Sequence, residues 1–535
     1  TNISDIGSVE NMDSLKSFSF ESTNVAKLNA IAYLKNIENL RMSGTRIVNL
    51  NDLAGFEKVK VLQFNNTVVS SLKGVEKMKL LERISFSGTA VTDLSILKNL
   101  KNLKVVHFDS TKVASLESIE GLELNTVYCD NSGITEKMAN DYMQKHKDCL
   151  VIYNSGVLLQ WWDEMPNEWK IEFAKILKTD KPDKLALHRL GLITELDISG
   201  NKEITSLAPI GNLIHLKKIN LAKTKVNNIA TLSELIELVE INCSYTGVTD
   251  LMPLSKLSNL EKLNFSGTAI SQMPLTNCNK LEIIKADSTD IKSLISIANL
   301  KHLKIVYADY TKLDEDAVQS FKKRKPETLV IYQTVELKKW WSLLDDNWKK
   351  IFKGEIIFEG KPSREQLGQI TAIKVLDLKN NSGITSLKPL EKLIDLEELK
   401  FSDTDVMDLT SLKGLKKLTS LKCSRNPIRS LQPLSELTKM EALDCSNTQI
   451  DNLEYIQNLT NLKVLKVSGT KIKNLKYLEK LHKLKHLEFS STDVRWLKPI
   501  MDLNNMKTIK CYNTKIIKMF MDKYKEARPN VDVIF

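Results

Sequence analysis

The sequence predicts an α/β solenoid, a stack of similar coils that each contribute one short strand to a parallel sheet. A threonine recurs every 22 residues, as at Thr23, Thr45, Thr67, Thr89 and Thr111. An alternating apolar run precedes each of these residues, and a second apolar segment follows it. A fixed period of this length indicates units that bury their apolar faces only by stacking on one another.

Each coil is expected to begin with a strand that ends in a turn. Counting back from Thr404, the apolar residues Phe401, Leu399 and Leu396 lie three, five and eight positions earlier. The alternation of apolar and polar positions predicts a strand with one buried face.

The segment after the threonine is expected to be a short helical or 3-10 turn. Sequences such as "LMPLSKL", "LKPLEKL" and "LQPLSEL" recur there. Proline suits the first position of such a turn because its missing N–H has no intrahelical partner in any case.

The threonine column continues through two further runs and is filled by Asn or Ser in a few coils, giving about 19 coils. Its remaining members are Thr224, Thr246, Thr268, Thr289, Thr311, Thr404, Asn426, Thr448, Thr470, Thr492 and Thr514, with Ser132, Asn201 and Asn381 at the ends of the runs.

The combined pattern L-x-x-L-x-L-x-x-N-x-L resembles that of leucine-rich repeat proteins, over about four fifths of the chain. The 22-residue length and the "PL" segment are similar to the bacterial internalin-like subclass. The resemblance implies a horseshoe-like solenoid with parallel strands on its concave face and short 3-10 or helical segments on its convex face. It also implies that the threonines form a buried hydrogen-bonded ladder to their own turn and the adjacent coil. Finally, it implies an inward column of unpaired cysteines: Cys129, Cys243, Cys423, Cys445 and Cys511.

The repeat breaks twice, at residues 149–177 and 328–356. We therefore predict three tandem modules: residues 1–153, 154–332 and 333–535. The second and third should each open with a Trp-rich helical cap, since apolar residues in the second break recur at helical spacing and the open end of a solenoid must be covered. These residues are Leu337, Trp341, Leu344, Trp348 and Phe352. An exposed aromatic hot spot for a partner is the alternative interpretation of this face. The first module lacks such a cap and starts at Thr1 rather than Met, which indicates processing or trimming before this residue.

The sequence contains no motif that predicts an enzyme, a cofactor or a metal site. His482 and His486 are four residues apart, but the repeat places them on different segments of a coil. The seven cysteines form no C-x-x-C pair, and no phosphate-binding glycine pattern occurs. The basic run "KKRK" at 322–325 is expected to be the solvated face of a module-closing helix rather than a nucleic-acid site. No apolar run approaches 18 residues, so no transmembrane segment is expected.

The concave face of the third module holds the candidate partner-binding residues. They are Lys400, Lys422, Asp444, Lys466, His486, Glu488, Lys510 and Tyr512. Their mixed signs disfavour nucleic acid, which would require a continuous basic stripe.

A neighbouring column of small residues has two possible interpretations. It consists of Ser402, Ser424, Ser446, Ser468 and Ser490, and in the first two modules it ends in Asp109, Asp130, Asp287 and Asp309, with Tyr128 and Tyr307 one column away. Either serine merely suits a crowded strand edge, or the column leaves room for an extended partner.

Together these features predict a non-enzymatic binding protein that recognises a protein partner or a glycan. The resemblance to internalin-like repeats implies a bacterial surface or secreted protein. An intracellular scaffold or sensor subunit of a larger complex is the alternative.

Overall fold

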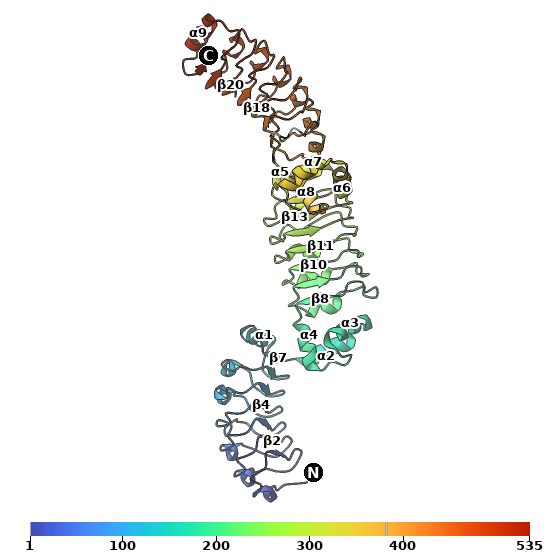
Figure 1. The fold of residues 1–535 in the computed structure, drawn as a ribbon. Helices are drawn as coiled ribbons and strands as arrows, with labels where there is room; N and C mark the ends of the chain where they lie inside the picture. Colours follow the sequence, from blue (N-terminus) through green and yellow to red (C-terminus); the bar gives the residue numbers. More distant parts are fainter. Residues whose placement is uncertain (1, 380, 382) are drawn as a thin grey trace. The chain divides into compact units, whose positions relative to one another are not determined.

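A computed structural model describes residues 2–379, 381 and 383–535 of the chain and shows the α/β leucine-rich repeat solenoid that the sequence predicts. Residues 1, 380 and 382 lie outside the described part. The chain forms two compact units, residues 1–261 and 262–535. Within each unit, the strand pairings of the described residues are parallel, and each strand lies beside the strand of the next coil (Figure 1).

The first unit contains a seven-stranded sheet followed by three further paired strands. The seven strands are β1 (Ser17–Ser19), β2 (Asn39–Arg41), β3 (Val61–Gln63), β4 (Arg83–Ser85), β5 (Val105–His107), β6 (Thr126–Tyr128) and β7 (Leu150–Ile152). The further three are β8 (Glu195–Asp197), β9 (Lys218–Asn220) and β10 (Glu240–Asn242).

The second unit contains four paired strands followed by an eight-stranded sheet. The four are β11 (Lys262–Asn264), β12 (Ile283–Lys285), β13 (Ile305–Tyr307) and β14 (Leu329–Ile331). The eight are β15 (Val375–Asp377), β16 (Glu398–Lys400), β17 (Ser420–Lys422), β18 (Ala442–Asp444), β19 (Val464–Lys466), β20 (His486–Glu488), β21 (Thr508–Lys510) and β22 (Asp532–Ile534).

The core forms because equivalent apolar residues of successive coils stack on one another. The central residue of each strand points inward, so Leu40, Leu62 and Ile84 are fully buried and lie opposite one another in register. Next to this column the rings of Phe64, Phe86 and Phe108 stack with centroids 5.8 and 6.0 Å apart. Each coil thus shields the apolar face of its neighbour, and the core continues along the stack.

The turn after each strand explains why the threonine recurs. The residue before it has a positive φ in nearly every coil, and glycine fills this place in five of them: Gly44, Gly88, Gly200, Gly267 and Gly469. Each ladder Thr then donates its hydroxyl to the carbonyl three residues earlier, as Thr448 does to Cys445 at 2.7 Å. Most of the threonines are buried, so this bond satisfies a carbonyl that water cannot reach.

The predicted bonds from the ladder to the adjacent coil form around Asn426. Its Nδ2 donates to the carbonyl of Phe401 in the preceding coil at 2.8 Å, and its Oδ1 accepts from the Thr404 N–H at 3.2 Å and from the Thr404 hydroxyl at 2.7 Å. An asparagine side chain is one bond longer than that of threonine and carries both a donor and an acceptor group, so it reaches the neighbouring coil.

Short 3-10 segments follow the turn in most coils, as predicted. Proline is the second residue of several of them, including η8 (Met252–Lys256), η10 (Lys388–Lys392) and η12 (Gln432–Leu434). The inward cysteine column is also confirmed, since its members are buried and form no disulfide: Cys129, Cys243, Cys423, Cys445 and Cys511.

The α-helices lie where the repeat is interrupted. Three of them, α1 (Glu136–Lys145), α5 (Glu315–Arg324) and α9 (Lys518–Ala527), precede β7, β14 and β22. After β7 come α2 (Ser155–Glu164), α3 (Asn167–Leu177) and α4 (Lys184–Gly191); after β14 come α6 (Thr334–Leu343), α7 (Asp346–Glu355) and α8 (Arg364–Thr371). We call residues 153–192 junction one and residues 332–372 junction two.

The Trp-rich segment of each junction is two helices rather than the single helix that was predicted. Pro166 separates α2 from α3, and the Asp345 side chain accepts from the Trp348 N–H to begin α7. The aromatic residues are nevertheless inward: Trp341, Trp348 and Phe352 join the core of the following coils, which favours the capping interpretation. The division into three modules stays a prediction, since the two compact units do not follow it. Among the described residues, no helix has the length and apolar character needed to span a membrane.

Candidate functional site

The predicted partner-binding residues lie on one face of the sheet β15–β22, which we call the third-sheet face. The strand register places Lys400, Lys422, Asp444, Lys466, Glu488 and Lys510 side by side in successive strands. His486 occupies the first position of β20, and Tyr512 follows β21 with about half of its surface exposed. Sequence periodicity therefore locates all eight residues on neighbouring coils.

Glu488 is the centre of an ion triad on this face. Its Oε1 lies 3.1 Å from Lys466 Nζ and 3.2 Å from Lys510 Nζ. Burial alone would raise the pKa of Glu488, but the hydrogen bonds from the two ammonium groups hold its pKa below the usual range. One carboxylate shared by two lysines leaves the triad with a net positive charge.

The serine column beside this face is part of the packing rather than the floor of a groove. Ser402, Ser424 and Ser490 are buried. Ser424 Oγ donates to Ser402 Oγ at 2.9 Å, and Ser490 N–H donates to Ser468 Oγ at 3.0 Å. The crowding interpretation of the sequence is thus the one that the structure supports.

The aspartates that end this column in the first unit hold junction one. Lys184 Nζ of α4 lies 2.7 Å from Asp109 Oδ2 and 2.7 Å from Asp130 Oδ2. The same ammonium group lies 5.2 Å from the centre of the Tyr128 ring. Asp130 also accepts from the N–H and the hydroxyl of Ser155 at the start of α2.

Junction two repeats this arrangement in the second unit. Arg364 of α8 contacts Asp287 at 2.8 Å and Asp309 at 3.3 Å, and its guanidinium lies 4.3 Å from the centre of the Tyr307 ring. Asp309 accepts from the N–H and the hydroxyl of Thr334 at 2.7 and 2.6 Å. An extended partner therefore has no free aspartates to bind at these two places.

Lys184 and Arg364 were not identified from the sequence, although a signal was present. Both stand two residues after the proline of a Lys-Pro dipeptide, in the two segments that align without gaps, "KPDKLALHRL" and "KPSREQLGQI". The aspartate pair precedes each of these segments, and the corresponding places in the third sheet hold Ser490 and Tyr512. Pairing the basic residue with the aspartates would have predicted the contact.

His107 beside Tyr128 is a neutral ring in this cluster. The two ring centroids are 3.8 Å apart. Burial lowers the pKa of His107 to about 4; the charge of Asp109 opposes this shift, and the charges of Arg83 and Lys184 add to it. In the second unit, Lys285 of β12 stands at the equivalent position and lies 5.7 Å from the centre of the Tyr307 ring.

The expectation that "KKRK" is a solvated face is wrong for its first residue. Lys322 is buried, and its Nζ lies 2.6 Å from Asp395 Oδ2, whose side chain is also buried. Lys417 binds the other oxygen of Asp395 at 2.7 Å. Burial tends to raise the pKa of Asp395, but Lys322 and Lys417 hold it below the usual range. The run carries a structural ion pair because α5 packs against the coil that contains Asp395.

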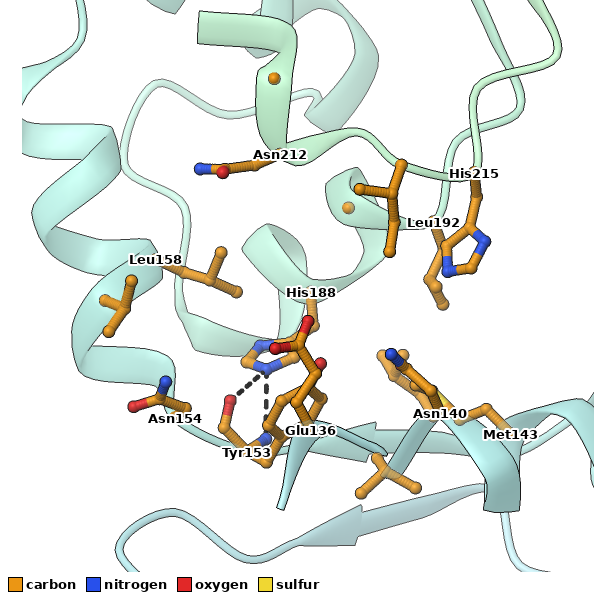
Figure 2. A pocket seen from close by; sticks show the side chains of 16 residues that line it. Glu136, Asn140, Met143, Tyr153, Asn154, Leu158, His188, Leu192, Asn212 and His215 are labelled. Carbon is orange, nitrogen blue, oxygen red and sulfur yellow. Dashed lines mark hydrogen bonds between the residues drawn. The ribbon is translucent and has the colours of Figure 1, made fainter. Parts of the chain in front are cut away.

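A cavity of about 280 Å³ lies behind junction one, between α1, α2, α4 and the coil after β8 (Figure 2). His188 forms part of its wall. Its Nδ1 lies 2.8 Å from the Lys184 carbonyl oxygen. Its Nε2 lies within hydrogen-bond distance of both backbone groups of Tyr153, 3.1 Å from the nitrogen and 2.8 Å from the carbonyl oxygen. His188 thus satisfies a backbone group at the open edge of β7, and the ring is held by structural bonds.

The described residues contain no group of three or more His, Cys, Asp or Glu side chains arranged to hold a metal ion. Burial raises the pKa of the Cys278 thiol to about 11 and that of Cys243 to about 12, which keeps both as thiols at neutral pH.

No protein-family model matches the sequence, and a search of curated proteins finds no match either. Solved structures of repeat proteins do resemble the chain. They include an internalin (InlF) of Listeria monocytogenes, with 20% identity over 69% of this chain and 94% of that chain and a TM-score of 0.29. A leucine-rich repeat protein of Leptospira interrogans shares 16% identity over the full length of both chains, with a TM-score of 0.31.

A third similar structure is the functional domain of InlJ from Listeria monocytogenes, described as including a cysteine ladder. It shares 13% identity over 94% of this chain and 74% of that chain, with a TM-score of 0.21. At these identities and TM-scores the function has to be argued from the surfaces of the molecule itself.

Proposed function

We propose that the protein is a non-enzymatic binding protein whose third-sheet face recognises a partner protein with an acidic surface. The observation that carries the proposal is a difference between the sheets. Near the end of β1–β7, Lys184 pairs with Asp109 and Asp130. Near the end of β11–β14, Arg364 pairs with Asp287 and Asp309. At the end of β15–β22, Tyr512 is exposed and the lysines of the triad keep a net positive charge.

The distribution of charge supports an acidic partner. Residues 463–528 contain 17 Lys or Arg and six Asp or Glu, an excess equal to the net charge of +11 of the whole chain. Several of these cations border the third-sheet face: Lys463, Lys485 and Lys507 stand one per coil directly before β19, β20 and β21. Such a field attracts an oppositely charged surface and speeds its association.

The partner is proposed to be a protein rather than a nucleic acid or a glycan. Asp444 and Glu488 interrupt the lysine column, which leaves no continuous basic stripe for phosphates. A half-exposed tyrosine among charges of both signs is typical of protein interfaces, where Tyr often contributes strongly. A glycan remains the second candidate partner.

A bacterial surface or secreted setting is proposed from the internalin-like repeat, and an intracellular scaffold is the alternative. Buried thiols with raised pKa values are compatible with both, since they resist oxidation and disulfide exchange. Protease treatment of intact cells that carry the protein distinguishes the two settings.

The test is a charge-exchange variant, Lys466→Glu with Glu488→Lys and Tyr512→Ala. A partner captured by crosslinking to the parent protein and then purified is titrated against parent and variant. We expect the variant to lose about 2 kcal/mol or more of binding free energy, as hot-spot truncations do, while its melting temperature stays close to that of the parent.

The matched control is Lys480→Glu with Lys498→Glu, which lowers the charge of the same coils away from the strands. It should change the salt dependence of binding far more than the affinity at high salt. Unchanged affinity of the charge-exchange variant would exclude the third-sheet face as the site. Heparin and RNA are then added as competitors at equal charge concentration. Full displacement of the partner by either one would favour a polyanion, rather than a protein, as the ligand.

A further inference from the structure

A second cavity, in junction two, is built differently from everything described above. It has a volume of about 570 Å³ and lies between α6, α7, α8 and the segment before α8. Its lining residues are Lys338, Trp341, Ser342, Lys349, Lys353, Gly360, Lys361, Pro362 and Leu367. This volume is within the range of pockets that hold small organic molecules.

The wall of this cavity combines an apolar floor with a rim of lysines. Trp341, Pro362 and Leu367 are buried. Four lysines reach the cavity from three segments, and the described residues that line it include no Asp or Glu. Like charges that converge on one cavity repel one another, and this repulsion is relieved when an anion binds among them.

The intramolecular contacts of these lysines leave the rim positively charged. Lys349 lies 3.9 Å from Asp346, whose side chain is fully exposed. Lys353 lies 5.9 Å from the centre of the Phe358 ring. A surface ion pair at this distance contributes little, and an aromatic ring does not neutralise an ammonium group.

Junction one shows that the fold does not require this arrangement. At the places of Lys338 and Lys353 it has Leu159 and Ala174, and at those of Ser342 and Gly360 it has Asp163 and Asp180. The corresponding set therefore contains two lysines and two aspartates. The same helices pack with either composition, so packing alone does not account for the four lysines.

We propose that the cavity of junction two binds a small organic anion with an apolar body, its carboxylate or phosphate group on the lysine rim and its body against Trp341 and Leu367. A lysine ammonium group accepts either headgroup as a point charge. The buried floor favours an alkyl or aromatic body, because it removes that body from water.

The experiment titrates the full chain with decyl phosphate and with decanoate, each below its micelle-forming concentration, by isothermal titration calorimetry. We expect saturable binding of one equivalent of at least one probe, which also identifies the preferred headgroup. Inorganic phosphate and decyltrimethylammonium should each bind at least about tenfold more weakly, since the former lacks the apolar body and the latter has the wrong charge.

The site is located with a variant that gives junction two the residues of junction one, Lys338→Leu with Lys353→Ala. It should raise the Kd of the preferred probe about tenfold. The matched control removes the two lysines of junction one, Lys170→Ala with Lys181→Ala, and should leave the Kd unchanged. Circular dichroism melting checks that both variants fold, and Lys361→Glu, at an exposed position of the rim, is the second variant.

Several outcomes would overturn the proposal. These are the absence of saturable binding by both alkyl anions, equal binding of the decyl cation, and equal binding of inorganic phosphate. An unchanged Kd in both junction-two variants, or a raised Kd in the junction-one control, would do the same. Because the third-sheet face lies on β15–β22, none of these results bears on the proposed recognition of a protein partner.

Discussion

Junction one and junction two anchor their helices on the same polar residues but fill the space behind them with different chemistry. Lys184 and Arg364 each join two aspartates beside a tyrosine ring. Behind this anchor, junction one has His188 bonded to the edge of β7, whereas junction two has Gly368 close to Ile331 and Leu329 of β14. In the helices that precede the two junctions, Met143 of α1 and the ion-paired Lys322 of α5 stand at equivalent sequence positions.

This difference teaches which contacts of a junction are interchangeable. The anchor has to neutralise two partly buried aspartates, and only a cation at that place can do so. The space behind the anchor only has to be filled and its backbone groups satisfied. A histidine with hydrogen bonds, or a glycine that lets the helix approach the strand, both meet that requirement.

The largest loss of stability is expected at the buried ion pair between Lys322 of α5 and Asp395. Asp395→Ala leaves the Lys322 ammonium group buried without its partner, so we expect a loss of about 3–5 kcal/mol in the free energy of unfolding. Denaturant titration of the full chain, followed by near-ultraviolet circular dichroism, measures this loss.

The matched control replaces the buried pair by apolar residues, Lys322→Met with Asp395→Leu, and Met is the residue at the equivalent position of α1, Met143. This double variant should recover most of the stability, because the remaining partner of Asp395, Lys417, is partly exposed and can be solvated. A double variant as unstable as Asp395→Ala would show that the ion pair is itself required.

The second effect separates the two ways of covering a strand edge. His188→Gly gives junction one the glycine of junction two, but without the close approach of helix and strand found there. The substitution leaves the Tyr153 N–H unpaired and adds a glycine to a helix. We expect a loss of about 3 kcal/mol. The loss should appear in hydrogen exchange as reduced protection of β7.

The reciprocal control is Gly368→Ala. A Cβ at this position would lie 3.3 Å from Ile331 Cγ1, a tight contact that offsets the gain in helix propensity. The change in stability should stay below about 1 kcal/mol. Equal effects of the two substitutions would contradict the distinction between the junctions.

The smallest effect concerns pH. Because burial lowers the pKa of His107 to about 4, the unfolded chain binds a proton between pH 6.5 and 4 that the folded chain does not bind. The stability around β5 and β6 is therefore complete above pH 6.5 and decreases as pH falls through this window, by about 2 kcal/mol given the partial exposure of the ring.

Hydrogen exchange at pH 7 and pH 5, corrected for intrinsic rates, tests this expectation. Protection should fall more in β5 and β6 than in β12 and β13, where Lys285 replaces the histidine. His107→Gln should remove most of the difference. Equal pH dependence in the two regions would show that His107 does not titrate as inferred.

Periodicity predicted the features that repeat and missed those that join distant segments. The register of Lys400, Lys422 and Asp444 followed from the 22-residue period, as did the burial of Cys423 and Cys445. The contact between Lys184 and Asp109 spans 75 residues, and no period connects them. Similarly, Lys322 of "KKRK", which was expected to be solvated, is buried because α5 packs on the coil of Asp395. Helix periodicity alone cannot indicate this contact.

Each ladder threonine donates its hydroxyl to a carbonyl of its own turn, as Thr448 and Thr470 do. A coil of this kind carries its turn bond with it as a self-contained unit. This has an evolutionary consequence. A gene that gains or loses the codons of one such coil by unequal recombination keeps the turn bond of every threonine, so the array can change length without new compensating mutations. Asn426, which bonds to the coil of Phe401 and accepts from the Thr404 hydroxyl, marks a place where such an exchange would be selected against.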